Sequence, residues 1–267
     1  MAHIIQKTLV SKQGAIIPLI AETGGQNTLV ADSSALSEQI VGDVINSAFD
    51  SAGQRCSALR VLYLQEDIAD GVLEMLEGAM KELTVSDPRW LSTDVGPVID
   101  EEAQANLLAH IEKMKSIGKL RYQVTLDAEL SKGTYVPPTV FEIKHLSDLK
   151  REVFGPILHV VRFKAKELQK VIDEINATGY GLTFGIHSRI QETVDFFVKR
   201  ARVGNIYVNR NIVGAVVGVQ PFGGQGLSGT GPKAGGPMYL HKLAVERTVS
   251  IDTTASGGNA SLMTIGD

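Results

Sequence analysis

The sequence predicts an α/β protein whose sheet is mostly parallel and covered by helices on both faces. Apolar runs of strand length alternate with amphipathic helical segments through most of the 267 residues. One of these runs, residues 157–163, is almost continuously apolar, which is typical of a strand buried on both sides. A hydrophobic fraction of 43% and a charged fraction of 21% are ordinary for a globular protein with a substantial core.

The first part of the chain contains two short apolar runs, residues 16–20 and 28–30, which are predicted as strands. Asp32, Ser33 and Ser34 supply N-cap chemistry for a helix whose apolar stripe extends over residues 40–49. That helix is expected to end near Gly53. Cys56 is therefore expected in the loop before a strand over residues 60–64.

The remainder of the chain continues the alternation. One amphipathic helix is expected over residues 68–83, and another begins at Asp100 with an acidic first turn and ends at Gly118. Residues 124–135 are expected to form an edge hairpin. The other expected elements are strands over residues 139–143, 157–163, 182–187 and 205–209 and helices over residues 168–175 and 193–200.

Composition and charge exclude several classes of function. A net charge of -4 gives no reason to expect nucleic acid or an anionic membrane as a partner. Six histidines are scattered without metal-ligand spacing and the chain has one cysteine, so no metal site is predicted. We find no signal peptide and no apolar run near the roughly 20 residues that span a bilayer. These features predict a cytoplasmic protein in a reducing compartment.

Glycine is concentrated late in the chain, where many of the 27 glycines fall between residues 204 and 236. Because glycine has no Cβ, it is the residue that allows one backbone segment to approach another closely. The late segment is therefore expected to be built from close backbone contacts.

The single cysteine, Cys56, follows Arg55 and is surrounded by small residues. A nearby cation lowers the pKa of a thiol and favours the reactive thiolate, so Cys56 is a candidate nucleophile that Arg55 helps to activate. The alternative is a small buried hydrophobic side chain, the commoner role of an unpaired cysteine. Glu22 precedes a threonine and two glycines and is, by itself, a weak signal, because glutamates before tight turns are commonly solvated loop acids.

Four motifs occur along the chain in the order Glu22, Cys56, Glu152-Val153-Phe154-Gly155-Pro156 and Pro221-Phe222-Gly223-Gly224. In these residues and their spacing the chain resembles the NAD(P)-dependent aldehyde dehydrogenase superfamily. Residues 54–58, 209–215, 217–224 and 229–236 look like the delta-1-pyrroline-5-carboxylate dehydrogenase branch, which oxidises L-glutamate γ-semialdehyde to L-glutamate. Residues 21–27 and 257–263 resemble the form of that branch fused to a proline dehydrogenase, an arrangement used in proline catabolism.

The resemblance implies a role for each motif. Cys56 would be the nucleophile that adds to the aldehyde, and its backbone N–H would lie near the developing oxyanion. Glu22 would be the base that activates water for hydrolysis of the thioester. Glu152, Phe154 and Gly25 would bind the cofactor, which is NAD, with NADP as an alternative. A loop acid at Glu152 and a core aromatic at Phe154 are the structural alternatives.

The resemblance also implies a small-molecule aldehyde as the substrate. Ser57 would donate a hydrogen bond to it, and Gly214 and Ala215 would cradle its carboxylate with backbone N–H groups. Phe222 would line the aldehyde pocket. An ordinary turn at Gly214 and simple packing of Phe222 stay open as alternatives. FAD is implied only for a proline dehydrogenase domain that this sequence does not contain.

The domain organisation implied by the resemblance is a catalytic domain over residues 1–250 without the dinucleotide-binding domain that precedes it in the family. No G-x-G-x-x-G phosphate loop opens a helix in this sequence. That preceding domain also supplies an asparagine to the oxyanion hole, so we expect little dehydrogenase activity from this chain alone. Residues 251–267 are expected to be an oligomerisation strand or a linker, and the full-length protein is expected to be a homo-oligomer. Membrane association of a full-length form is left open.

Two other classes of function remain as alternatives. The chain is also consistent with a truncated homologue or a non-catalytic interaction module, in which an alternating strand over residues 244–252 is added to a neighbouring subunit. A cysteine hydrolase is a third interpretation. It requires a histidine paired with Cys56, and neither His159 nor His187 lies in a motif that suggests this role.

Overall fold

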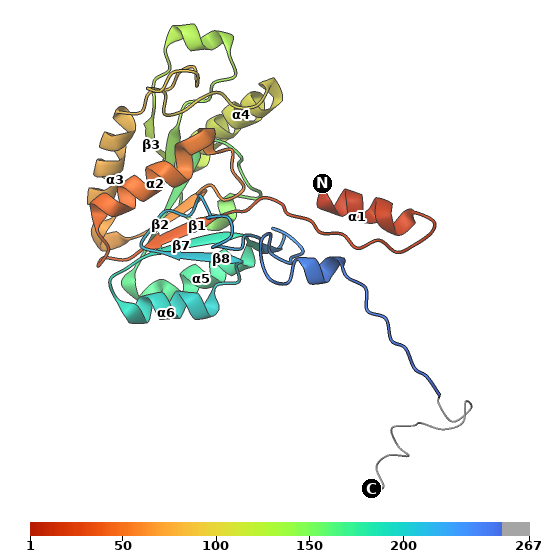
Figure 1. Ribbon diagram of the computed structural model, residues 1–267. Helices are drawn as coiled ribbons and strands as arrows, with labels where there is room; N and C mark the ends of the chain where they lie inside the picture. The colour runs from red at the N-terminus through yellow and green to blue at the C-terminus, as the bar shows by residue number, and fades with distance from the viewer. Residues whose placement is uncertain (253–267) are drawn as a thin grey trace.

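The computed structural model describes residues 1–252 and is built on a seven-stranded sheet (Figure 1). The strand order is β3-β4-β5-β2-β1-β7-β8, and only the β3–β4 pair is antiparallel. The prediction of a mostly parallel sheet is therefore confirmed. The strands are β1 (Thr28–Ala31), β2 (Val61–Gln65), β3 (Lys119–Gln123), β4 (Thr139–Glu142), β5 (Ile157–Phe163), β7 (Thr183–His187) and β8 (Asn205–Val208).

Helices cover both faces of this sheet, as the sequence predicts (Figure 1). Strand register places His159 and Phe184 on one face, where His110 of α4 contacts His159 and Phe197 of α6 packs against Phe184. α5 reaches the same face through a hydrogen bond to β2, while α2 and α3 pack together on the other. The helices are α1 (Ala2–Ser11), α2 (Ser37–Phe49), α3 (Glu66–Lys81), α4 (Glu101–Ile117), α5 (Leu168–Ala177) and α6 (Gln191–Arg200).

The hydrophobic core is continuous around the central strands. Every residue of β1, β2 and β7 is buried, because a parallel strand between two helical layers has no solvent-facing side. The amphipathic stripes predicted for the helices supply the other side of the core. Ile40, Val44 and Phe49 of α2 are completely buried. α4 begins as predicted, with the side chain of Asp100 accepting a hydrogen bond from the Ala103 N–H.

Several local predictions are wrong. The edge strand is Lys119–Gln123, which lies before the predicted hairpin, and residues 124–135 form a loop with a short 3-10 helix, Ala128–Lys132. α2 starts at Ser37 without a side-chain cap. Asp32 instead accepts hydrogen bonds within its own turn. Residues 16–20 form no strand, and Ile16 is fully exposed.

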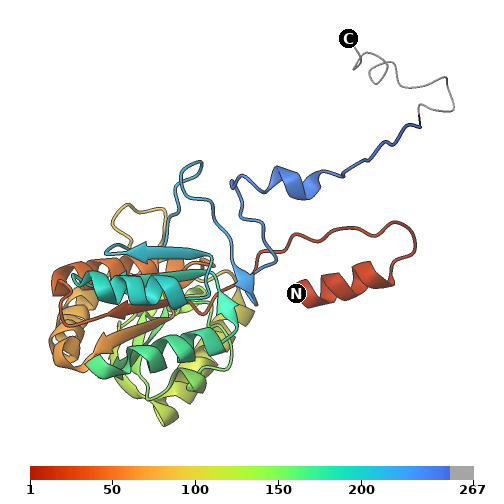
Figure 2. The same ribbon diagram turned by 90° about the horizontal axis from the view of Figure 1, so that it is seen from below.

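Both ends of the described chain project from the sheet on the same side (Figures 1 and 2). α1 was not expected from the sequence, and none of its residues is buried. Residues 244–252 are exposed and form no strand within this chain, so strand addition to a neighbouring subunit stays a prediction. The proposed tail over residues 251–267 lies, from residue 253 onward, outside the described residues. No helix within residues 1–252 is both long and apolar enough to span a bilayer.

The fold brings the predicted motifs to one edge of the sheet. Glu22 precedes β1, Cys56 precedes β2 and Glu152 precedes β5. These three strands are adjacent and parallel, so the segments before them meet at the amino-terminal edge. Residues 53–57 are called the Cys56 loop below, and residues 152–156 are called the Glu152 loop.

Candidate active site

The Cys56 loop begins with a tight reversal of the backbone. Ser51, Ala52 and Gly53 all have positive φ values, of 55°, 53° and 65°. Gly53 is required there, because a Cβ at this position would lie 2.3 Å from the Gly155 carbonyl oxygen. The reversal leaves Cys56 exposed and buries the next residue, Ser57.

Asn27 holds the Cys56 loop in place by hydrogen bonds, a role that the sequence analysis did not identify. Its side-chain amide is buried and donates to the carbonyl oxygens of Cys56, at 2.6 Å, and Ala58, at 2.9 Å. Its amide oxygen accepts from the Thr183 N–H. Gly25 makes room for this side chain, since a Cβ on Gly25 would lie 2.3 Å from Asn27 Oδ1. One side chain therefore ties the Cys56 loop to two strands.

The segment carrying Glu22 is held by the late glycine-rich region. Glu22 forms an isolated bridge with Gly229, and the backbone of Thr23 donates to the Ser228 carbonyl. The Thr23 hydroxyl donates to the Leu227 carbonyl at 2.6 Å. Gly229 has a φ of 154°, and a Cβ there would crowd the Ala21 carbonyl oxygen at 3.0 Å. The expectation that the late glycines allow close backbone approaches is therefore confirmed at this position.

The electrostatic setting of Cys56 differs from the expected one. Partial burial is the main cause that raises the pKa of its thiol, and the charges of Glu152 and Glu22 raise this pKa further. Two backbone N–H groups, of Cys56 itself and Ser57, favour the thiolate and oppose this shift. The expected activation of the thiol by Arg55 is not found, because its guanidinium donates to Ser51 Oγ and its charge is not among the causes that shift the pKa of Cys56. Both carboxylates nevertheless act on the sulfur, so the fold gathers Glu22, Cys56 and Glu152 at one place.

Glu152 is paired with a buried cation that sequence reasoning did not identify. Arg60 is 1% exposed and meets Glu152 Oε1 at 3.0 Å. Burial raises the pKa of Glu152, while Arg60 and the backbone N–H of Gly25 lower it. Gly24 also approaches this carboxylate closely, since a Cβ on it would lie 1.7 Å from Oε2. Arg60 directly precedes β2, and nothing in the spacing of residues around it indicated a role in the site.

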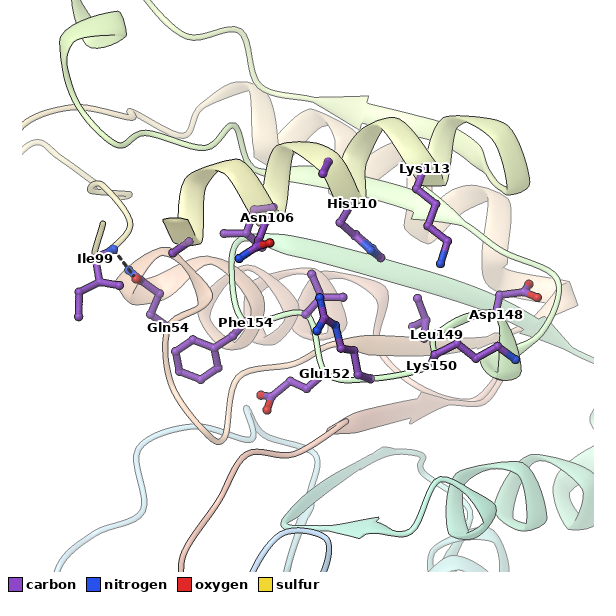
Figure 3. Close-up of a pocket in the computed structure, with 15 residues that line it drawn as sticks. Gln54, Ile99, Asn106, His110, Lys113, Asp148, Leu149, Lys150, Glu152 and Phe154 are labelled. Atoms are coloured by element: carbon purple, nitrogen blue, oxygen red, sulfur yellow. Dashed lines mark hydrogen bonds between the residues drawn. The ribbon is translucent and has the colours of Figure 1, made fainter. Parts of the chain in front are cut away.

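A cleft of about 550 Å³ opens beside the Glu152 loop, between that loop and α4 (Figure 3). Glu152 and Phe154 border one end together with Gln54, and Phe154 is 45% exposed. His110 points into the middle of the cleft. Cys56 and Glu22 do not line this space, so the cleft adjoins the thiol rather than containing it. Polar side chains beside an accessible aromatic ring are suited to binding a ribose and a flat ring.

The four predicted substrate residues come from three segments of the chain. Ser57 is buried beside the thiol and its carbonyl accepts from the Thr183 hydroxyl. Gly214 has a φ of 71° and is exposed, and Ala215 follows it in the same loop. Phe222 is half-buried and pairs through its backbone with Ala234. Within residues 1–252, no hydrogen bond joins Gly214, Ala215 or Phe222 to Cys56, and their roles stay predictions.

Neither histidine considered for a cysteine hydrolase pairs with Cys56. His159 is fully buried, and its ring nitrogens meet His110 and the carbonyl oxygen of Arg60. His187 lies 3.3 Å from Asp43. Within the described part of the chain, no group of three or more His, Cys, Asp and Glu side chains is arranged to hold a metal ion.

The chain belongs to the aldehyde dehydrogenase family, whose model matches residues 2–249. It is similar to bifunctional protein PutA of Escherichia coli, with 56% identity over 258 residues, which are 94% of this chain and 20% of that protein. It is also similar to a 1-pyrroline-5-carboxylate dehydrogenase from a Geobacillus species, with 39% identity over 87% of this chain and 45% of the relative.

Solved structures agree with this assignment. A proline utilization A (PutA) structure superimposes with a TM-score of 0.90 at 55% identity, over 96% of this chain and 26% of that one. A 1-pyrroline-5-carboxylate dehydrogenase from Thermus, solved with bound NAD, gives a TM-score of 0.84 at 34% identity, over 90% of this chain and 47% of that one. The chain therefore spans about a fifth of the curated PutA proteins and under half of the single-function enzymes.

Proposed function

We propose that this chain carries the catalytic half of an L-glutamate γ-semialdehyde dehydrogenase that serves proline catabolism. The observation that carries the proposal is the meeting of Cys56, Glu22 and Glu152 at the amino-terminal edge of the sheet. Further support comes from the similarity to PutA and to 1-pyrroline-5-carboxylate dehydrogenases along most of the chain. An exposed thiol that feels the charges of two carboxylates suits an acyl-transfer reaction in which one carboxylate acts as a base.

The thiolate of Cys56 attacks the aldehyde carbon, forming a C–S bond while the carbonyl electron pair moves to oxygen. Backbone N–H groups of Cys56 and Ser57 favour negative charge on the sulfur and would also stabilise the oxyanion that forms next to it. The C–H bond of this thiohemiacetal then breaks as the carbonyl re-forms, leaving a thioester on Cys56. Glu22 takes a proton from water, which attacks the thioester and releases L-glutamate and the thiolate.

NAD, or NADP as an alternative, supplies the acceptor for the hydride that leaves the thiohemiacetal. The cleft beside the Glu152 loop fits the nicotinamide end of such a cofactor, because it combines the Phe154 ring with a carboxylate and amide groups. Glu152 would accept hydrogen bonds from ribose hydroxyls, and Phe154 would pack beside the ring. Gly25 contributes by directing its N–H to the Glu152 carboxylate.

Recognition of the amino-acid end of the substrate is proposed for Ser57, Gly214 and Ala215. Gly214 is exposed and adopts positive φ, and no atom lies within 4 Å of where a Cβ would stand, so its loop can offer backbone N–H groups to a carboxylate. Phe222 is proposed as an apolar wall for the aldehyde chain. We further propose the homo-oligomeric state and the cytoplasmic location expected from the sequence.

The proposal is tested by measuring protection of Cys56 against iodoacetamide with increasing L-glutamate γ-semialdehyde, read out by peptide mass spectrometry. Adduct formation with the semialdehyde should slow the alkylation of Cys56. Propanal lacks the charged groups, which contribute about 1.4 kcal/mol or more of binding free energy, so it should need at least about tenfold higher concentration to protect Cys56 equally. Equal protection by the two aldehydes, or none, contradicts the proposal.

We also propose that residues 1–267 by themselves form little NADH. The loss of one oxyanion-hole donor typically costs about 100- to 1000-fold in rate. Mixing the purified chain with NAD and the semialdehyde and following absorbance of NADH checks this. Turnover at the rate of an intact 1-pyrroline-5-carboxylate dehydrogenase contradicts it.

A further inference from the structure

Arg60 is the most completely buried cation at the amino-terminal edge, and its guanidinium contacts both loops of the site. Nη1 donates to the carbonyl oxygens of Gly53, at 2.7 Å, and Gly155, at 3.3 Å. Nη2 donates to the Arg55 carbonyl at 3.1 Å and to Glu152 Oε1 at 3.0 Å. Nε donates to the same carboxylate oxygen at 3.3 Å.

The remaining face of the guanidinium is also used. Arg60 Cζ lies 5.0 Å from the centroid of the Phe154 ring, within the range of a cation–π contact. An ionised group buried this deeply is strongly unfavourable unless each donor finds a partner, and burial lowers the pKa of Arg60 despite its pairing with Glu152. The fold therefore supplies an unusual density of acceptors around one side chain.

The contacts fall in two segments that are distant in sequence. Gly53 and Arg55 belong to the Cys56 loop, while Glu152, Phe154 and Gly155 belong to the Glu152 loop. We propose that Arg60 is a positioning residue that sets the Cys56 loop against the Glu152 loop and neutralises Glu152 beside the thiol. The roles of the two loops rest on the proposed function, but the contacts of Arg60 do not.

Lysine cannot replace the guanidinium in this position. Its ammonium is a compact point charge, whereas arginine presents donors in a planar fork that reaches several acceptors at once. The Arg60→Lys variant would keep a positive charge near Glu152 and lose the simultaneous hydrogen bonds to both loops. The charge function and the positioning function of Arg60 can therefore be separated by experiment.

The charge function is tested through the pH midpoint of Cys56 alkylation by iodoacetamide, in the purified chain without aldehyde or cofactor. The charged groups that face the thiol are Glu22, Glu152 and Arg60. Arg60→Met should raise the midpoint by about one pH unit, because it removes a cation and leaves Glu152 unpaired. Arg60→Met with Glu152→Gln should bring the midpoint back toward wild type.

Arg121→Met is the matched control, since Arg121 is also paired with carboxylates but lies on β3 away from the thiol. Its midpoint should equal that of wild type. A wild-type midpoint in Arg60→Met, or the same midpoint in the single and double variants, overturns the charge function. If Arg60 served only to stabilise the fold, adding Glu152→Gln would not return the alkylation midpoint of Arg60→Met toward the wild-type value.

The positioning function is tested with Arg60→Lys, which keeps the charge and stays informative if Arg60→Met does not fold. Amide hydrogen exchange in residues 53–57 and 152–156 should be about tenfold faster than in wild type, and Arg121→Lys should leave both segments unchanged. Wild-type exchange in both segments overturns the proposal. The alkylation midpoints and the hydrogen exchange of the Arg60 variants need no substrate. Failure of the semialdehyde to protect Cys56 would therefore contradict the proposed function and leave the role of Arg60 intact.

Discussion

The two edges of the sheet use polar side chains in opposite ways. At the amino-terminal edge, Cys56 is exposed beside Glu22 and Glu152, and a cleft adjoins them. At the carboxyl-terminal edge, the residues that follow β1, β7 and β8 are also polar, but they satisfy one another. One edge therefore leaves reactive groups accessible, while the other is closed by its own hydrogen bonds.

The closed edge is centred on Asp32, which is 5% exposed. Its carboxylate accepts hydrogen bonds from the Ser34 backbone and hydroxyl and from the Ser188 hydroxyl. Asn209 closes the ring by exchanging hydrogen bonds with the backbone of Ser188. Parallel α/β sheets usually bind ligands outside the carboxyl ends of their strands, so sheet topology alone would point away from the edge that carries the candidate site.

The largest expected effect is on activity at the open edge. Cys56→Ala removes the sulfur that forms the proposed thioester and should lower semialdehyde oxidation by at least about 10⁴-fold in an enzyme of full family length. The free energy of unfolding should change by less than about 1 kcal/mol, because the side chain is exposed. Steady-state kinetics and urea denaturation check the two parts, and retained turnover would assign the nucleophile elsewhere.

The closed edge should show the reverse behaviour. Asp32→Ala leaves the buried Ser188 hydroxyl and the Ser34 N–H without their acceptor and should lower the free energy of unfolding by about 2 to 4 kcal/mol. The pH midpoint of Cys56 alkylation in the folded variant should stay at the wild-type value. Urea denaturation and alkylation measure both, and a shifted midpoint would show that the two edges are coupled.

Folding stability should also depend on pH through His110 and His159, which are paired near the open edge. Burial lowers the pKa of His110 to about 4 and that of His159 to about 3, so both are neutral in the folded chain until the pH approaches 4. Below about pH 6.5 the unfolded chain binds protons that the folded chain does not. Stability is therefore full above about pH 6.5 and falls as the pH drops toward 4, by up to roughly 1.4 kcal/mol per pH unit for each histidine.

His110→Gln should flatten this decline, because one of the two titrating groups is removed. Urea denaturation between about pH 7 and pH 4 compares the two slopes. An unchanged slope in the variant would mean that His110 is already protonated in the folded chain at these pH values.

The smallest expected effects come from two glycines. Gly24→Ala brings a Cβ to within 1.7 Å of Glu152 Oε2, and that carboxylate is held by buried Arg60, so the variant should lose about 1 to 3 kcal/mol of stability. Gly42→Ala is the matched control, since Gly42 lies in α2 with open space around it and should gain about 0.5 to 1 kcal/mol. Thermal unfolding measures whether each variant is less or more stable than wild type, and stabilisation by Gly24→Ala would show that Glu152 can move freely.

Much of the fold was predictable, because the strands are buried and the helices amphipathic. The apolar run that becomes β5 and the stripe of α2 follow directly from the periodicity of the sequence. The edge strand β3 was misplaced because it is exposed, with polar residues that resemble a loop. Exposed α1 likewise has no buried stripe that would mark it.

The motifs of the candidate site were predictable in order, but the side chains that support them were not. Arg60 and Asn27 act through tertiary contacts to backbone groups far away in sequence, which no spacing rule contains. Arg55 was overvalued for the same reason, since adjacency in sequence did not place its charge beside the thiol.

The central claim is that Glu22 faces Cys56 across the open edge, and the pH midpoint of Cys56 alkylation in Glu22→Gln tests it most directly. In wild type the midpoint should lie above that of an ordinary thiol, because burial, Glu152 and Glu22 all raise the pKa of Cys56. Removal of the Glu22 charge should lower the midpoint, by less than removal of the Glu152 charge does. A midpoint unchanged in Glu22→Gln would show that the carboxylate does not face the sulfur and would contradict the account.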